Sequence, residues 1–147
     1  MDTDIVEVSA QPLPLLVVDA ANVVGSVPDG WWRDRRGAAE RLRDTLVPVA
    51  EHGLVLPPDR VPGPWHGGRP DVVLVVEGAA RRVAGIPRVQ GVEALGSGDD
   101  RIVELVGAAR SADPERACLV VTADRELRIR VTSLGAEVAG PRTVRPA

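Results

Sequence analysis

The chain has 147 residues, of which 44% are hydrophobic and 27% charged, the composition of an ordinary globular protein. It has one cysteine, which excludes a disulfide scaffold and favours a reducing cytoplasm. With no apolar stretch long enough to span a bilayer, no membrane partner is expected, and the net charge of -3 confines any nucleic-acid contact to a local patch.

Strand and helix patterns alternate along the chain after residues 1–12, a leader that we expect to be disordered. The predicted strands are Leu13–Asp19, Asp71–Val76, Val89–Leu95, Ala117–Val121 and, as a short one, Ala136–Ala139. Helices are predicted from Arg33 to His52, from Asp99 to Ser111 and from Asp124 to Leu134. Pro48 is expected to kink the first of these helices or to end it early. A loop at Val23–Trp32 and a Pro/Gly-rich connection at residues 53–70 separate the first three elements. This alternation implies right-handed βαβ crossovers, so we predict one α/β domain over residues 13–147 with a mainly parallel sheet of four to five strands.

Acidic residues follow the ends of the predicted strands. Asp19 and Glu77 close two aliphatic runs, Asp124 follows a third, and Asp99 and Asp100 open a helix after a Gly-Ser-Gly turn. Parallel strands bring these positions to one edge of the sheet, where open α/β sheets place their ligands. Converging carboxylates repel one another, and hard cations such as Mg²⁺ or Mn²⁺ are the usual remedy. The pattern therefore predicts metal-dependent hydrolysis of a phosphodiester or a phosphoanhydride.

The same acids also have purely structural interpretations. Asp99, Asp100 or Asp124 can serve as the N-cap of the helix that follows it. Asp19 and Glu77 are not explained in this way, since neither opens an obvious helix. The coincidence of acids at several strand ends favours a functional site.

Polar and aromatic neighbours extend the candidate site. Asn22 either forms an Asx-turn or positions substrate, and Thr122 either caps the last helix or positions a metal-bound water. The segment Trp31–Arg36 combines the indoles of Trp31 and Trp32 with the guanidinium groups of Arg33, Arg35 and Arg36 near the expected cleft, a device for binding single-stranded nucleic acid. The alternative is a tryptophan pair that seals the loop over the core beside a solvated arginine face.

Four segments resemble a known family in order and spacing. Val17–Gly25 resembles the opening "DGxN" segment of NYN domains, in particular the YacP-type branch of the PIN-like nucleases. Gly98–Glu104 resembles that family's acid-rich helix start, Val120–Asp124 its "VTxD" strand end, and Leu134–Ala136 the glycine turn that follows. The resemblance covers about Leu15 to Gly140, nearly the whole chain.

This resemblance implies a three-layer α/β/α PIN-like fold and a Mg²⁺- or Mn²⁺-dependent ribonuclease that hydrolyses RNA. By position, Asp19, Asp99 and Asp124 match the family's metal-site acids, with Asp100 as an adjacent catalytic candidate. Glu77 is a further metal-ligand candidate.

Two departures from the family pattern leave other functions open. Ala20 stands where the YacP-type branch usually has Gly, and Glu77 stands where it usually has Asp. The alternatives are a nucleoside triphosphate pyrophosphohydrolase that uses the same acids, or a non-catalytic RNA-binding module. PIN-like domains often pair, so a homodimer is among the expected assemblies, although no residue pattern marks an interface.

Overall fold

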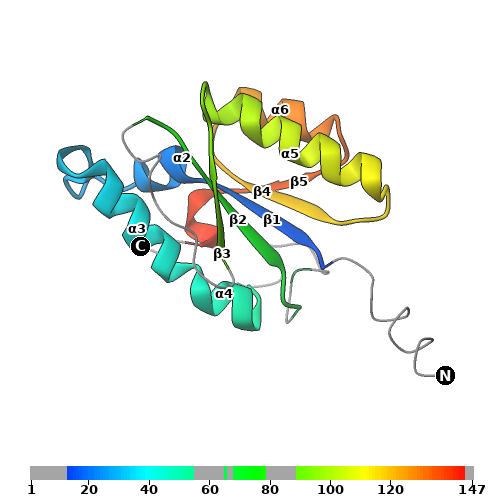
Figure 1. The fold of residues 1–147 in the computed structure, drawn as a ribbon, viewed down its shortest axis with the longest axis horizontal. Coiled ribbons are helices and arrows are strands. Elements are labelled where there is room, and N and C mark those ends of the chain that lie inside the picture. Colours follow the sequence, from blue (N-terminus) through cyan, green and yellow to red (C-terminus); the bar gives the residue numbers. More distant parts are fainter. Residues whose placement is uncertain (1–12, 55–64, 66–67, 79–88, 145–147) are drawn as a thin grey trace.

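The computed structural model describes residues 13–54, 65, 68–78 and 89–144. A five-stranded, fully parallel sheet in the order β3-β2-β1-β4-β5 lies between two layers of helices (Figure 1). The strands are β1 (Leu15–Asp19), β2 (Asp71–Val76), β3 (Val89–Glu93), β4 (Cys118–Val121) and β5 (Glu137–Ala139). The helices are α2 (Ala20–Val24), α3 (Arg35–Thr45), α4 (Val47–His52), α5 (Gly98–Ala112) and α6 (Arg125–Thr132), with 3₁₀ turns at Trp31–Arg33 and Pro141–Thr143. The predicted α/β class and three-layer arrangement are confirmed, whereas the predicted leader at residues 1–12 lies outside the described residues.

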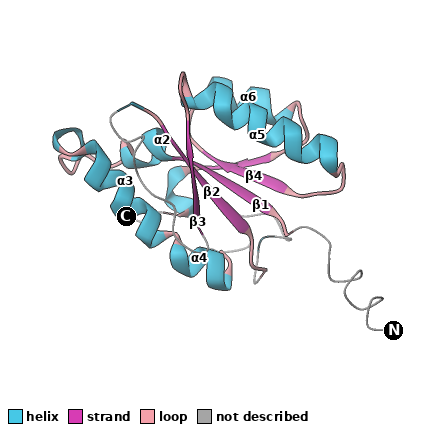
Figure 2. Cartoon of the chain, in the orientation of Figure 1, coloured by secondary structure: helices cyan, strands magenta, loops and turns pink. Residues whose placement is uncertain are grey.

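Two apolar cores hold the layers together, one on each face of the sheet. Successive side chains of a strand point to opposite faces. In β1, Leu16 and Val18 belong to the core under α2, α3 and α4, while Leu15 and Val17 belong to the core under α5 and α6. Figure 2 shows the strands enclosed between these two groups of helices. Burial on both faces explains why the strands read as continuous aliphatic runs.

The long helix predicted from Arg33 to His52 is broken in two places. The first predicted helical residue, Arg33, lies instead in a 3₁₀ turn. Helix α3 begins after Asp34, which caps it by accepting the Gly37 N–H on Oδ1 at 2.9 Å. The helix ends at Thr45, and Pro48 lies in the first turn of α4. Proline has no N–H to donate and its ring clashes with the carbonyl four residues earlier, so α3 cannot continue through it. The break that the sequence predicted at Pro48 is confirmed.

None of the helices in the described part of the chain is long and apolar enough to cross a membrane. The other predicted elements agree with the structure to within a few residues at their ends, where assignments commonly vary.

The order of the strands in the sheet determines where the site lies. β1 lies in the middle of the sheet, and the chain switches direction between β1 and β4, the point at which open α/β sheets bind ligands.

Candidate functional site at the carboxyl edge of the sheet

Asp19 lies at the centre of this edge, because it is the last residue of the middle strand. It is only 5% exposed. Its Oδ2 accepts the hydroxyl hydrogen of Thr122 at 3.0 Å, and its Oδ1 accepts the N–H of Asn22 at 3.3 Å. The second bond makes Asp19 the N-cap of α2. The prediction that Asp19 opens no helix is therefore wrong, because a short helix follows the strand directly.

Thr122 and Asn22 join the end of β1 to the loop after β4. Thr122 is fully buried, and its oxygen also accepts the N–H of Asp124 at 3.1 Å. The side-chain oxygen of Asn22 accepts the N–H of Ala123 at 2.8 Å. Asn22 thus links α2 to the loop after β4, instead of forming the Asx-turn considered from the sequence. Together these bonds fix the two chain segments on either side of the switch point.

Two further helices, α5 and α6, start at this edge and are capped by different kinds of residue. Asp124 caps α6, with its Oδ1 accepting the N–H of Leu127 at 2.9 Å, as the capping interpretation predicted. Ser97 caps α5, with its hydroxyl oxygen accepting the N–H of Asp100 at 3.1 Å. The interpretation of Asp99 or Asp100 as the N-cap is therefore wrong. Both carboxylates lie in the first turn of α5, where the helix dipole favours negative charge.

Asp99 and Asp100 differ in their partners. Asp100 Oδ1 accepts from Arg130 Nη2 at 2.9 Å, which ties the start of α5 to α6. Within the described residues the Asp99 carboxylate makes no hydrogen bond or ion pair. Asp99 therefore has both oxygens available to a ligand, whereas Asp100 is partly neutralised by an arginine.

Glu77 follows β2 and points toward the start of α5. Its Oε2 accepts the backbone N–H of Gly98, the first residue of that helix. The contact depends on glycine, because a Cβ at position 98 would overlap this carboxylate oxygen. The structure thus attaches the longer acid, which departs from the family pattern, to the helix that carries Asp99.

Burial and mutual repulsion disfavour ionisation at this edge. Burial, helped by the charges of Asp99 and Glu77, raises the pKa of Asp19 to about 6 against the opposing effect of the hydrogen bonds from Thr122 and Asn22. Burial also raises the pKa of Asp99, with further increases from Asp124 and Glu77 and a decrease from Arg130. The structure therefore brings Asp19, Glu77, Asp99 and Asp124 within electrostatic reach of one another.

The donor chemistry at this edge fits a hydrated hard cation. In this conformation no three Asp, Glu, His or Cys side chains of the described ranges form a group that could hold a metal by themselves. Mg²⁺ does not require such a cage, because it usually keeps several waters and takes one or two carboxylates together with substrate phosphates. Asp99, with both oxygens available, and the neighbouring Asp19 are carboxylates of this kind, and because burial raises the pKa of Asp19, this group must lose its proton to bind the ion.

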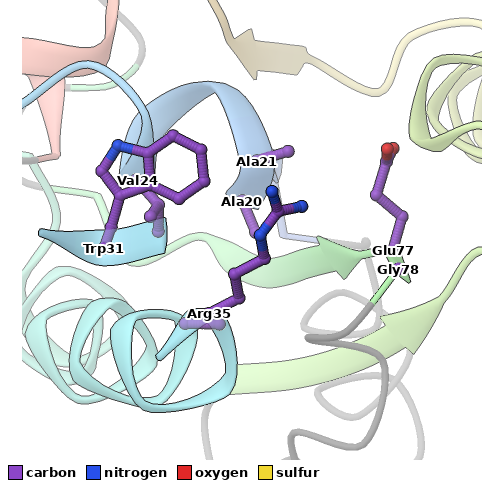
Figure 3. Close-up of a pocket in the computed structure, with 8 residues that line it drawn as sticks. Ala20, Ala21, Val24, Trp31, Arg35, Glu77 and Gly78 are labelled. Carbon is purple, nitrogen blue, oxygen red and sulfur yellow. The ribbon is translucent and has the colours of Figure 1, made fainter. Parts of the chain in front are cut away.

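Of the aromatic and basic residues predicted to bind substrate, Trp31 and Arg35 share a pocket with Glu77, whereas Arg33 does not line it. The rings of Trp31 and Trp32 meet edge to face, with centroids 5.9 Å apart. Arg35 lies 5.3 Å from the centre of the Trp31 ring, and Arg33 lies 5.9 Å from that of Trp32. Trp31 packs partly on the core, whereas Trp32 is 50% exposed. The sealing interpretation thus describes Trp31 in part, and Arg35 lines a pocket together with Glu77 (Figure 3).

Sequence reasoning missed three contributors to this edge: Ser97, Gly98 and Arg130. The first two carried a local signal, because a Gly-Ser-Gly turn before an acidic helix start is a typical N-terminus. Arg130 carried none, since its partner Asp100 lies on another helix 30 residues away. Its neighbour Arg128 donates to the backbone oxygen of Thr122 at 2.8 Å and supports the same loop.

Comparison with known proteins finds a match among solved structures but none among sequences. No protein-family model matches the chain, and no curated protein sequence matches it. Among solved structures it resembles the crystal structure of Rae1 (YacP) from Bacillus subtilis, with a TM-score of 0.65 and 18% identity over 89% of this chain and 71% of that chain. The chain has a YacP-type fold. A tryptophan-to-leucine mutant of Rae1 gives a TM-score of 0.59 and 20% identity over 90% of this chain and 72% of that chain. This agrees with the PIN-like three-layer architecture that the sequence resemblance implied.

Proposed function

We propose that the protein is a metal-dependent ribonuclease that hydrolyses phosphodiester bonds in RNA. The observation that carries the proposal is the acidic edge around Asp19, a buried carboxylate whose pKa is raised to about 6 and which is surrounded by the charges of other acids. A divalent cation would relieve the cost of ionising this group. The YacP-type fold supports an RNA-related activity.

Asp19, Asp99 and Asp124 are the acids proposed to hold Mg²⁺ or Mn²⁺, with Glu77 at the margin of the site. When bound, such an ion supplies charge stabilisation to the phosphoryl oxygens and lowers the pKa of a coordinated water. Asp99 is favoured over Asp100 as a ligand because Asp100 already pairs with Arg130. Asp100 is proposed to orient water or substrate at the rim of the site.

The chain's own residues prepare this edge by fixing the acids in place. Thr122 orients Asp19 and Asp124 through a single hydroxyl group, and Asn22 holds the adjoining backbone. In the proposed reaction a water attacks phosphorus in line with the leaving oxygen; the bond between phosphorus and that oxygen breaks, the attacking water loses a proton, and the leaving oxygen gains one. Fixed carboxylates reduce the reorganisation that this step requires.

The test is cleavage of end-labelled single-stranded RNA by wild type and by Asp99→Asn, with Mg²⁺ or Mn²⁺ and with EDTA. We expect wild type to cut only with the metal, and the variant to lose at least about 100-fold in rate, more than residues outside the metal shell usually cost. Glu104→Gln is the matched control, because this acid lies on the same helix but pairs with Arg101 at 3.2 Å in solvent. Equal cleavage by wild type and Asp99→Asn would contradict the assignment.

A second candidate is an RNA-binding module without catalysis, favoured by one specific observation. Asp19, Glu77 and Asp124 each already accept backbone hydrogen bonds, so each has a structural role that needs no metal. This candidate predicts RNA retention that is insensitive to Mn²⁺ and no cleavage. Hydrolysis of free nucleoside triphosphates with RNA left intact would instead identify a pyrophosphohydrolase.

A further inference from the structure

A small pocket opens beside the acidic edge, between α2, the start of α3 and the end of β2 (Figure 3). Its cavity is about 80 Å³, several times the ~10–15 Å³ that one water molecule needs. Trp31 forms one wall, and the small side chains of Ala20, Ala21, Val24 and Ala39 line much of the remainder. This mostly apolar lining suits a largely apolar group.

The charged groups of this pocket are Arg35 and Glu77, and they are engaged differently. Glu77 is bonded to the backbone of α5. Arg35 is exposed and contacts the Trp31 ring, and no carboxylate in the described part of the chain pairs with it. Its neighbour Arg36, by contrast, lies 3.5 Å from Glu40. Arg35 therefore presents an unneutralised guanidinium group at the mouth of an apolar pocket.

We infer that this pocket binds one unpaired nucleotide of a single-stranded RNA, next to the bond to be cut. The base lies against Trp31 and the alanine-rich wall, and a backbone phosphate pairs with Arg35. Because Glu77 lines the pocket and also acts on the charges of Asp19 and Asp99, a nucleotide bound here would lie beside the acidic edge. The inference rests on the proposed function and adds the form of the substrate.

The geometry selects single strands for a physical reason. A base within a duplex is stacked and paired on its neighbours, and entry into a side pocket requires that it leave the stack. A base in a single strand can stack on an indole without that cost, and such stacking tolerates any of the four bases. The pocket therefore predicts selectivity for strandedness with little selectivity for sequence.

The test measures binding of a short fluorescent single-stranded RNA by anisotropy in EDTA, so that no hydrolysis occurs. Arg35→Gln is the main variant, and Arg36→Gln is its control, since it makes the same change of charge at the next residue. We expect Arg35→Gln to weaken binding about tenfold and Arg36→Gln to change it far less. A matched RNA duplex should bind wild type more weakly and should not distinguish the two variants.

The tryptophan wall provides a second readout. Trp32→Phe removes the exposed indole and leaves Trp31 together with the buried Trp65, so quenching of the remaining emission by RNA reports on the pocket. We expect quenching in Trp32→Phe and its loss on addition of Arg35→Gln. This measurement leaves the core contacts of Trp31 in place and does not depend on a variant that disturbs folding.

Equal loss of binding in Arg35→Gln and Arg36→Gln, or equal affinity for single strands and duplex, would overturn the inference. The outcome is separate from that of the proposed function. RNA that binds through Arg35 without being cut when Mn²⁺ is added would keep the pocket assignment and contradict the nuclease. RNA that is cut at the same rate by both arginine variants, with no difference in binding, would keep the nuclease and remove the pocket.

Discussion

The hydroxyl group of Thr122 donates a hydrogen bond of 3.0 Å to Oδ2 of Asp19, across 103 residues of sequence. The same oxygen accepts the backbone N–H of Asp124. One buried hydroxyl thus connects the two acids on either side of the point where the sheet changes direction. The position of Asp19 depends on this contact.

Thr122→Val should destabilise the fold and perturb Asp19. Valine keeps the shape of threonine but removes a donor from one buried group and an acceptor from another, which costs about 1–3 kcal/mol of unfolding free energy. The pKa of Asp19 should rise further, because the hydrogen bond from Thr122 lowers it. Urea unfolding at neutral pH measures the loss of stability. Thr132→Val, at an exposed position of α6, is the control, and an equal effect there would contradict the role of Thr122.

The stability of the metal-free protein should fall as pH rises from about 4 to about 6. Burial raises the pKa of Asp19 from 3.8 to about 6 in the fold, so the folded state binds the proton more tightly than the unfolded chain does in this window. Below it both states are protonated, and above it the buried charge destabilises the fold by roughly 3 kcal/mol. The Asp19→Asn variant has no side-chain proton to lose in this range, so this contribution to the pH dependence of stability is absent from it.

The measurement is the unfolding free energy of wild type and Asp19→Asn in EDTA across this range. The difference between the two proteins isolates Asp19 from the other acids. We expect Asp19→Asn to gain stability relative to wild type as pH rises. If the difference in unfolding free energy does not change with pH, the pKa of Asp19 is not raised in the folded state, and the prediction is wrong.

Glycine at position 98 allows the close approach of the Glu77 carboxylate. Gly98→Ala should displace this carboxylate from the start of α5, and because it is the end of a flexible side chain, the cost is that of the lost hydrogen bond, about 1 kcal/mol. Gly107→Ala is a matched control on the same helix, because the nearest atom to its new Cβ is a Leu134 methyl group at 3.9 Å. We expect this control to gain about 0.5–1 kcal/mol. Thermal unfolding compares them, and equal effects of the two substitutions would refute the packing argument.

The paired acids at the start of α5 should be unequal in catalysis. Asp100→Asn removes a carboxylate that already pairs with Arg130 and should reduce RNA cleavage by about tenfold or less. Asp99→Asn removes the carboxylate without such a partner and should cost far more. Cleavage rates at saturating Mn²⁺ provide the comparison. A larger loss for Asp100→Asn would reverse the two roles.

The parts of this fold that could be predicted from the sequence are those set by local pattern. Aliphatic runs ending at Asp19 and Val76 indicated buried parallel strands, and parallel topology then placed their acids at one edge. Pro48 indicated the helix break through its missing N–H. In these cases one segment of chain contains both the cause and the effect.

The parts that could not be predicted depend on distant partners. The short helix α2 has too few residues to show a period, and its cap is also the last residue of a strand. Trp65 belongs to a Pro/Gly-rich stretch, yet it is 1% exposed, and its indole N–H donates to Glu137, 72 residues away. The pairing of Asp100 with Arg130 is of the same kind. Only the folded chain brings such groups together.

The most direct test of the nuclease assignment is a calorimetric titration of Mn²⁺ into wild type and Asp19→Asn, with RNA cleavage measured on the same samples. We predict that wild type binds the ion and cuts RNA, and that Asp19→Asn remains folded but loses both. Metal binding and cleavage that persist in Asp19→Asn, or no Mn²⁺ binding by wild type, would contradict the account.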